Sequence, residues 1–277
     1  MLKVVAIAAV LVCPALAAEE TAIDRALQHL YNFDFKSAHA LLDKYIEAHP
    51  EEPLPYAFRA SAFLFFELDR LQVLEAEFLT DDEKLAEKKK KLEPDAAVRV
   101  NFMKAMEDTT KRGEAAVKAN PQDKNALLAL CIAQGVATDY MALVEKKQIA
   151  SLGAAKKSNN YAQQVLKLDP KYYDAYLTAG FSEYMVGSLP FFVRWFVRFD
   201  NVSGSKERGL ENLRLTAREG RYFKAFAKIL ISIISLREKK PLEAQKLLAE
   251  LARDYPGNPL FRKELVKVSN KLGMAAN

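Results

Sequence analysis

Histidine and cysteine are the residue types in this chain most able to bind a metal ion or act as a nucleophile. The three histidines are His29, His39 and His49. A metal site would require them to converge with a further carboxylate or thiol. Their spacing instead places two on opposite helices of a hairpin and one just before a proline. We therefore interpret them as surface and helix-end residues, and predict neither a metal nor a cofactor.

Cys131 stands between Leu130 and Ile132 in an apolar stretch, which favours a small buried hydrophobic residue over a nucleophile. No histidine lies near it in the sequence to act as an activating base. The chain also contains no Gly-rich phosphate loop, no G-x-S-x-G elbow and no H-E-x-x-H motif. We predict no catalytic residues and a protein that is not an enzyme.

The composition favours an all-α fold. Half of the 277 residues are hydrophobic and 28% are charged, a globular balance, while Gly (10) and Pro (11) are few for a chain of many strands and turns. Ala, Leu, Lys and Glu, which are good helix formers, are abundant. The formal net charge of +5 is mild, and no dense basic patch accompanies a reading motif. Nucleic acid is therefore not an expected partner.

The first residues are typical of a secretory signal peptide. Lys3 is followed by an apolar run from Val4 to Cys13, and Ala15-Leu16-Ala17 provides a small-x-small cleavage pattern. A run of this length is too short to span a bilayer. Lipid attachment at Cys13 is the weaker interpretation, because Val12 precedes it where a small residue would be wanted. We expect a signal peptide at 1–17 and a periplasmic or secreted protein.

Similar segments recur along the chain. In each segment a helix ends at a proline. A few turn residues and another amphipathic helix follow the proline. The four prolines are Pro50, Pro121, Pro170 and Pro256. Ala38 and Ala244 each stand twelve residues before such a proline. This pattern resembles the tetratricopeptide repeat (TPR) family, in which a small alanine packs where two helices cross. A generic helical bundle is the alternative.

The resemblance implies helix-turn-helix repeats stacked into an α-solenoid over residues 18–277, with about five helix pairs plus a closing helix. The spacing of the prolines exceeds the family period of about 34 residues in the centre of the chain, which indicates insertions. Thr109 and Ser158 replace the small alanine there. The expected pairs are 22–30 with 35–47, 56–78 with 95–119, 125–144 with 155–168, 173–186 with 206–219, and 222–236 with 242–254, closed by 260–272.

Two insertions stand out. Residues 81–92 are almost wholly charged and predict a solvated helix, or a contact of the lysine run with an anionic surface. Residues 188–204 contain an aromatic segment, 189–199. On a helix, Phe192, Trp195, Phe196 and Phe199 would form one apolar stripe, with Arg194 and Arg198 on another side. This segment either fills a gap between repeats or is exposed as a membrane-interface or docking helix.

In the family the first helix of each pair lines a concave groove. The matching positions are Asn125, Leu128, Ile132, Asp174, Leu177, Phe181 and Tyr184. Their mostly apolar character favours an extended peptide or partner helix. We therefore expect an exported, non-enzymatic scaffold or adaptor that binds another protein, for instance in cell-envelope assembly. The alternative is binding of a lipid or apolar small molecule, or membrane-interface association, through segment 189–199.

Overall fold

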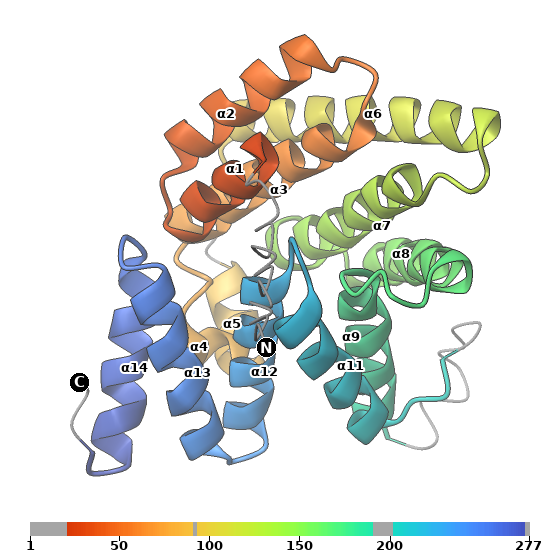
Figure 1. The fold of residues 1–277 in the computed structure, drawn as a ribbon. Coiled ribbons are helices and arrows are strands. Elements are labelled where there is room, and N and C mark those ends of the chain that lie inside the picture. Colours follow the sequence, from red (N-terminus) through yellow and green to blue (C-terminus); the bar gives the residue numbers. More distant parts are fainter. Residues whose placement is uncertain (1–20, 91–92, 191–201, 275–277) are drawn as a thin grey trace, which may run out of the picture.

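The computed structural model describes residues 21–90, 93–190 and 202–274 (Figure 1). Over these residues the chain is all-helical, with thirteen α-helices, one short π-helix and no strand. The predicted signal peptide, 1–17, lies outside the described residues. So do Phe192, Arg194, Trp195, Phe196, Arg198 and Phe199 of the aromatic segment. What the sequence predicts for these parts stays a prediction.

The helices pack as pairs in series along the chain. The bounds are α1 Ala22–Tyr31, α2 Phe35–Ala48, α3 Pro53–Arg70, α4 Ala76–Leu79, α5 Asp82–Lys90, α6 Ala96–Ala119, α7 Lys124–Asp139, π-helix η1 Tyr140–Val144, α8 Gln148–Leu168, α9 Ala175–Ser188, α11 Lys206–Glu219, α12 Lys224–Arg237, α13 Pro241–Asp254 and α14 Pro259–Lys271. The packed pairs are α1 with α2, α3 with α6, α7 with α8, α9 with α11, and α12 with α13. The second helix of each pair also contacts the next pair, and α14 closes the series. This serial packing is compatible with an α-solenoid.

Small buried residues lie on the second helix of the pairs, where helices pack closely. Ala38 and Ala244 are fully buried. At the equivalent positions of the central pairs, Thr109 and Ser158 are also buried. The Thr109 hydroxyl donates to the Ala105 carbonyl at 2.7 Å, and the Ser158 hydroxyl donates to the Cys131 carbonyl at 2.8 Å. Because each polar group is satisfied, a hydroxyl residue replaces alanine here without an unpaired donor.

The helix expected over 56–78 is in fact interrupted. Helix α3 ends at Arg70, and Gln72 adopts a left-handed backbone with φ 53°. The Val73 amide then donates to the Leu68 carbonyl at 3.1 Å, which satisfies a carbonyl at the helix end. Neither Gly nor Pro stands at this turn to signal it, so the apolar pattern alone suggested one long helix.

A buried glutamate joins this turn to the next helix. Glu67 is 1% exposed and accepts two hydrogen bonds from Arg70, at 2.8 and 2.9 Å. The same carboxylate accepts from the Asp95 amide at 2.8 Å, and Asp95 is the N-cap of α6. The charge-rich helix α5 therefore lies in a connection whose two ends are held together at Glu67.

The first and last helix pairs contact each other, so the series of helices curves back on itself (Figure 1). Arg221 binds Asp24 of α1 with two hydrogen bonds, at 2.9 and 3.1 Å. The Asn258 side chain donates to the Tyr31 carbonyl at 2.9 Å, and the rings of Tyr31 and Tyr255 lie 5.4 Å apart. The two ends of the described chain thus share one core.

This contact is close enough to restrict side-chain size. The Gly257 amide donates to the Asn32 side-chain oxygen at 2.8 Å. A Cβ on Gly257 would lie 3.0 Å from that oxygen and 3.2 Å from the Asn32 carbonyl. Glycine therefore allows the turn between α13 and α14 to approach the end of α1.

Helix α7 and the following π-helix form the apolar centre of the fold. The segment Lys124–Val144 is long and apolar enough to cross a membrane, with a mean hydropathy of 1.7. However, 56% of its most apolar window is buried within the fold. It packs against α3, α6 and α8, so a core helix explains its composition.

Candidate functional site: a central apolar cavity

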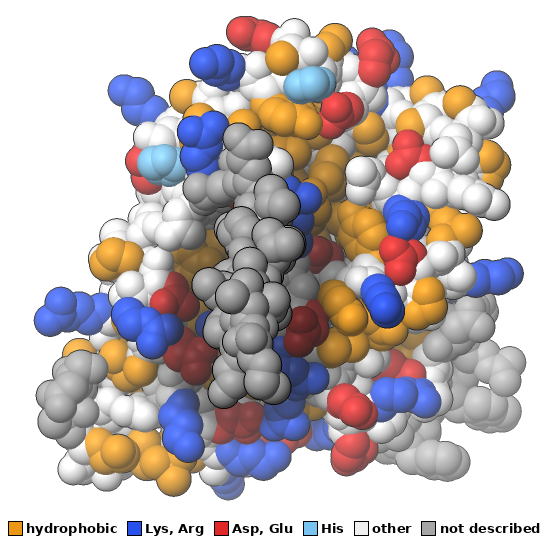
Figure 2. Space-filling model, viewed as in Figure 1, with side chains coloured by type: hydrophobic (Ala, Val, Ile, Leu, Met, Phe, Trp, Pro, Cys, Tyr) orange, Lys and Arg blue, Asp and Glu red, His pale blue; other side chains and the backbone are white. Residues whose placement is uncertain are grey.

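The curved series of helices forms two adjoining hollows, each partly open to the surface, which we call the first cavity (about 390 Å³) and the second cavity (about 610 Å³). Their walls share eight residues, so we treat them as one central cavity. The shared residues are Leu30, Tyr31, Phe65, Asp139, Phe181, Met185, Phe226 and Leu230. In Figure 2, hydrophobic side chains gather in the upper middle of one face and to the right of its middle.

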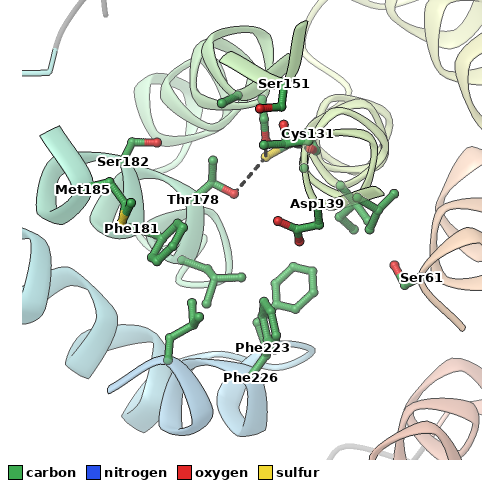
Figure 3. A pocket seen from close by; sticks show the side chains of 18 of the residues that line it. Ser61, Cys131, Asp139, Ser151, Thr178, Phe181, Ser182, Met185, Phe223 and Phe226 are labelled. Carbon is green, nitrogen blue, oxygen red and sulfur yellow. Dashed lines mark hydrogen bonds between the residues drawn. The ribbon is translucent and has the colours of Figure 1, made fainter. Parts of the chain in front are cut away.

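The walls come from the first helix of all five pairs: α1, α3, α7, α9 and α12. Aromatic and aliphatic side chains dominate them. In Figure 3, Phe181, Phe223 and Phe226 lie around the centre of the first cavity. Because these helices belong to pairs far apart in the sequence, the cavity exists only when the first and last pairs are in contact.

The predicted groove residues divide between the cavity and other places. Ile132, Leu177 and Phe181 line the first cavity, and Phe181 and Tyr184 line the second. Tyr184 is buried and donates through its hydroxyl to Glu238 at 3.2 Å. Leu128 is 1% exposed and belongs to the core. Asn125 is exposed and accepts from the Tyr172 hydroxyl at 2.7 Å, outside the cavity wall.

Asp174 is buried and binds the turn before α12 instead of lining the cavity. Its carboxylate accepts three backbone hydrogen bonds, from Arg221 at 3.1 Å and from Tyr222 and Phe223 at 2.9 Å each. Burial raises the pKa of this carboxyl, although the three amides oppose that change. The residue therefore holds the turn that carries both Phe223 of the cavity wall and the Arg221 ion pair with α1.

Asp139 is the charged residue in the wall of the first cavity, and sequence reasoning missed it. It is the last residue of α7 and directly precedes the π-helix, an uncommon element that is often found at functional sites. Tyr140, the next residue, stacks on Phe102 of α6 with the ring centroids 4.4 Å apart. The turn thus directs Tyr140 toward α6, while the Asp139 carboxylate points into the cavity (Figure 3).

The electrostatic state of Asp139 is unusual. Burial in apolar surroundings raises the pKa of its carboxyl from 3.8 to about 7. Among the described residues it has no ion-pair partner and accepts no side-chain hydrogen bond, and desolvation is the one cause of the shift. An unpaired carboxyl in an apolar cavity costs folding free energy and is a candidate binding group.

This shift predicts a pH-dependent stability. The folded chain holds the Asp139 proton more tightly than the unfolded chain, so the free energy of unfolding should fall as pH rises from about 4 to 7. Between about pH 5 and 7 the loss is about 2 kcal/mol. Asp139→Asn should lack this fall. Urea unfolding of both proteins at the two pH values measures it, and parallel pH profiles would contradict the assignment.

Hydroxyl groups supply the remaining polarity of the first cavity. Five of them donate their proton to a backbone carbonyl, at distances from 2.7 to 3.3 Å; they belong to Tyr31, Ser61, Thr138, Ser151 and Ser158. A hydroxyl has one proton to donate and two acceptor lone pairs. These groups therefore present acceptors to anything else that they contact.

The residues first considered for chemistry have local partners. His29 lies 2.9 Å from Asp34, and His49 lies 3.3 Å from Glu52. His39 packs its ring on Phe63, with the centroids 4.1 Å apart. Cys131 is buried, which raises the pKa of its thiol, and it donates to the Thr178 hydroxyl at 3.3 Å. A buried thiol with a raised pKa is a poor nucleophile.

No protein-family model, no characterised protein and no solved structure matches this chain.

Proposed function

We propose that this protein binds an elongated apolar molecule of the lipid class in its central cavity and performs no chemistry of its own. The observation that carries the proposal is the cavity itself, with a largely apolar lining to which the first helix of all five pairs contributes. Its volumes fall within the range of about 300–1,000 Å³ that is typical of small-molecule sites.

The curvature of the helix series favours binding of an apolar molecule over the protein-binding scaffold that the sequence predicts. An extended partner chain needs an open groove with accessible backbone and side-chain positions. Here the Arg221 and Asn258 contacts join the ends of the series, and two of the expected groove residues, Leu128 and Asp174, are buried in packing or capping roles. Binding of a peptide in the cavity is one of the outcomes that the experiment below distinguishes.

The proposal includes the two sequence-based expectations on family and location. The serial pairs and the small residues at 38, 109, 158 and 244 support a TPR-like solenoid. The N-terminal pattern supports export. An exported carrier or sensor would meet apolar molecules outside the cytoplasm.

Filling the cavity should abolish binding. Leu230 lines both cavities and is partly buried, so Leu230→Trp places a larger side chain in the shared space. We expect the affinity for diphenylhexatriene, an elongated apolar probe that fluoresces on leaving water, to fall about tenfold or more, since each 1.4 kcal/mol of lost contact is tenfold. The measurement is a fluorescence titration.

The matched control is Leu242→Trp on α13, where the side chain is 55% exposed and the same substitution should leave the affinity unchanged. Circular dichroism of both variants checks that the helices are retained. If wild-type protein does not bind the probe, or if both variants bind equally well, the cavity is not a ligand site. Binding of a peptide in place of the apolar probe would support the protein-binding scaffold.

A further inference from the structure

The polar groups that line the first cavity favour one kind of ligand head group. Its wall contains one carboxylate, Asp139, and no Lys, Arg, His, Asn or Gln among the described residues. A fatty acid or a phosphate head group would meet this carboxylate with no cation beside it. Burying two like charges together without a counter-ion is strongly unfavourable.

The hydroxyl groups do not change this preference. Five of them donate their proton to backbone carbonyls, as described above, so that only their acceptor lone pairs remain for a ligand. Thr138 and Ser151 are among these five and line the same cavity as Asp139. Thr178, whose hydroxyl accepts from the Cys131 thiol, and Ser182 also line this wall, so five of its seven hydroxyls present acceptors. Together with the Asp139 carboxylate, this lining fits a ligand group with several N–H donors and a positive charge.

We infer that the ligand carries an aliphatic amine, whose ammonium group binds the Asp139 carboxylate while its apolar chain extends through the shared wall into the second cavity. This inference rests on the proposed function. A charge-assisted hydrogen bond would form between ammonium and carboxylate, and the half-buried Asp139 carboxyl would gain the partner that it lacks in the protein alone. The raised pKa of the free carboxyl agrees with this role, since a bound cation would favour its ionised form.

The far part of the cavity suits the apolar chain. Leu68, Leu143, Ile229 and Phe261 line the second cavity. The charged residues of its wall other than Asp139 are paired. Asp82 pairs with Arg237 at 2.6 Å, Lys206 with Glu238 at 3.8 Å, and Glu264 with Lys267 at 2.9 Å. Asp139 thus provides the unpaired charge at the place where the two cavities adjoin.

Displacement of diphenylhexatriene by three ligands of equal chain length tests the inference. These are dodecylamine, dodecanol and dodecanoic acid, each kept below the concentration at which it self-associates. We expect dodecylamine to bind wild-type protein at least about tenfold more tightly than either of the others, the usual scale for a hydrogen bond to a charged group. In Asp139→Asn this preference should disappear, while the apolar probe still binds.

Asp123→Asn is the matched control, because Asp123 is also an aspartate at an end of α7 but caps the helix outside the cavity. It should keep the preference for the amine. Equal binding of the three ligands, tighter binding of the acid, or an unchanged preference in Asp139→Asn would each overturn the inference while leaving the proposed function intact. Failure of diphenylhexatriene to bind wild-type protein would instead overturn the proposed function.

Discussion

Replacing Asp174 with alanine is expected to lower the free energy of unfolding by about 4 kcal/mol. Asp174 is 5% exposed and accepts the amides of Arg221, Tyr222 and Phe223. Alanine leaves three donors without a partner, each costing about 1–3 kcal/mol where water cannot replace the carboxylate. Relief of the desolvation that raises the Asp174 pKa returns a part of this cost.

Two variants separate this role from a general effect of losing an aspartate. Asp174→Asn retains one acceptor oxygen and should cost about half as much. Asp123→Ala removes a half-exposed N-cap that also accepts two backbone amides, and should cost about 1 kcal/mol. Urea unfolding measures all three. A loss below about 1 kcal/mol for Asp174→Ala would show that the turn before α12 does not depend on this carboxylate.

Truncating Phe58 to alanine should also lower the free energy of unfolding by about 4 kcal/mol, the usual range for a phenylalanine in a packed core. Phe58 on α3 is 1% exposed, and its ring lies 5.3 Å from Tyr222 and 6.0 Å from Phe223. It therefore joins an N-terminal helix to the turn before α12. Weaker packing there should increase amide hydrogen exchange in α12 as well as in α3.

Phe66→Ala is the matched control on the same helix. Phe66 is 39% exposed and makes an edge-to-face contact with Phe35 at 5.6 Å, so its loss should cost about 1 kcal/mol. Faster exchange confined to α3 in Phe58→Ala would mean that the two ends of the helix series do not stabilise each other.

The helix pairs could be predicted because their signals are local. Prolines at 50, 121, 170 and 256 follow helix ends, and the apolar periodicity between them is helical. Ala38 and Ala244 lie at close helix contacts, and buried Thr109 and Ser158 show that a hydroxyl can replace alanine when the adjacent backbone carbonyl accepts its proton.

The contact between the two ends could not be predicted from the same signals. Arg221 and Asp24 are 197 residues apart, and neither is distinguished from other surface charges by its neighbours in the sequence. The family pattern assigns groove positions by counting residues along a helix. Counting along a helix cannot predict that the Asp174 carboxylate binds the backbone amides that precede α12.

Asp139 was missed for a related reason. It is the last residue of a largely apolar helix, and the sequence there resembles an ordinary polar helix end. Only the π-turn at Tyr140–Val144 and the position of the last helix pairs place its carboxylate in a cavity. A carboxyl at the end of a largely apolar helix, with no basic residue one turn away, is the signal that could have identified it.

Native mass spectrometry of the protein, purified without denaturant from the cells that produce it, tests the central claim most directly. The claim predicts a one-to-one adduct of low mass that is released on unfolding, extracts into organic solvent, and is absent from Leu230→Trp but present in Leu242→Trp. Bare protein that also fails to take up added diphenylhexatriene, or an adduct that proves to be a peptide, would contradict binding of an apolar molecule in the central cavity.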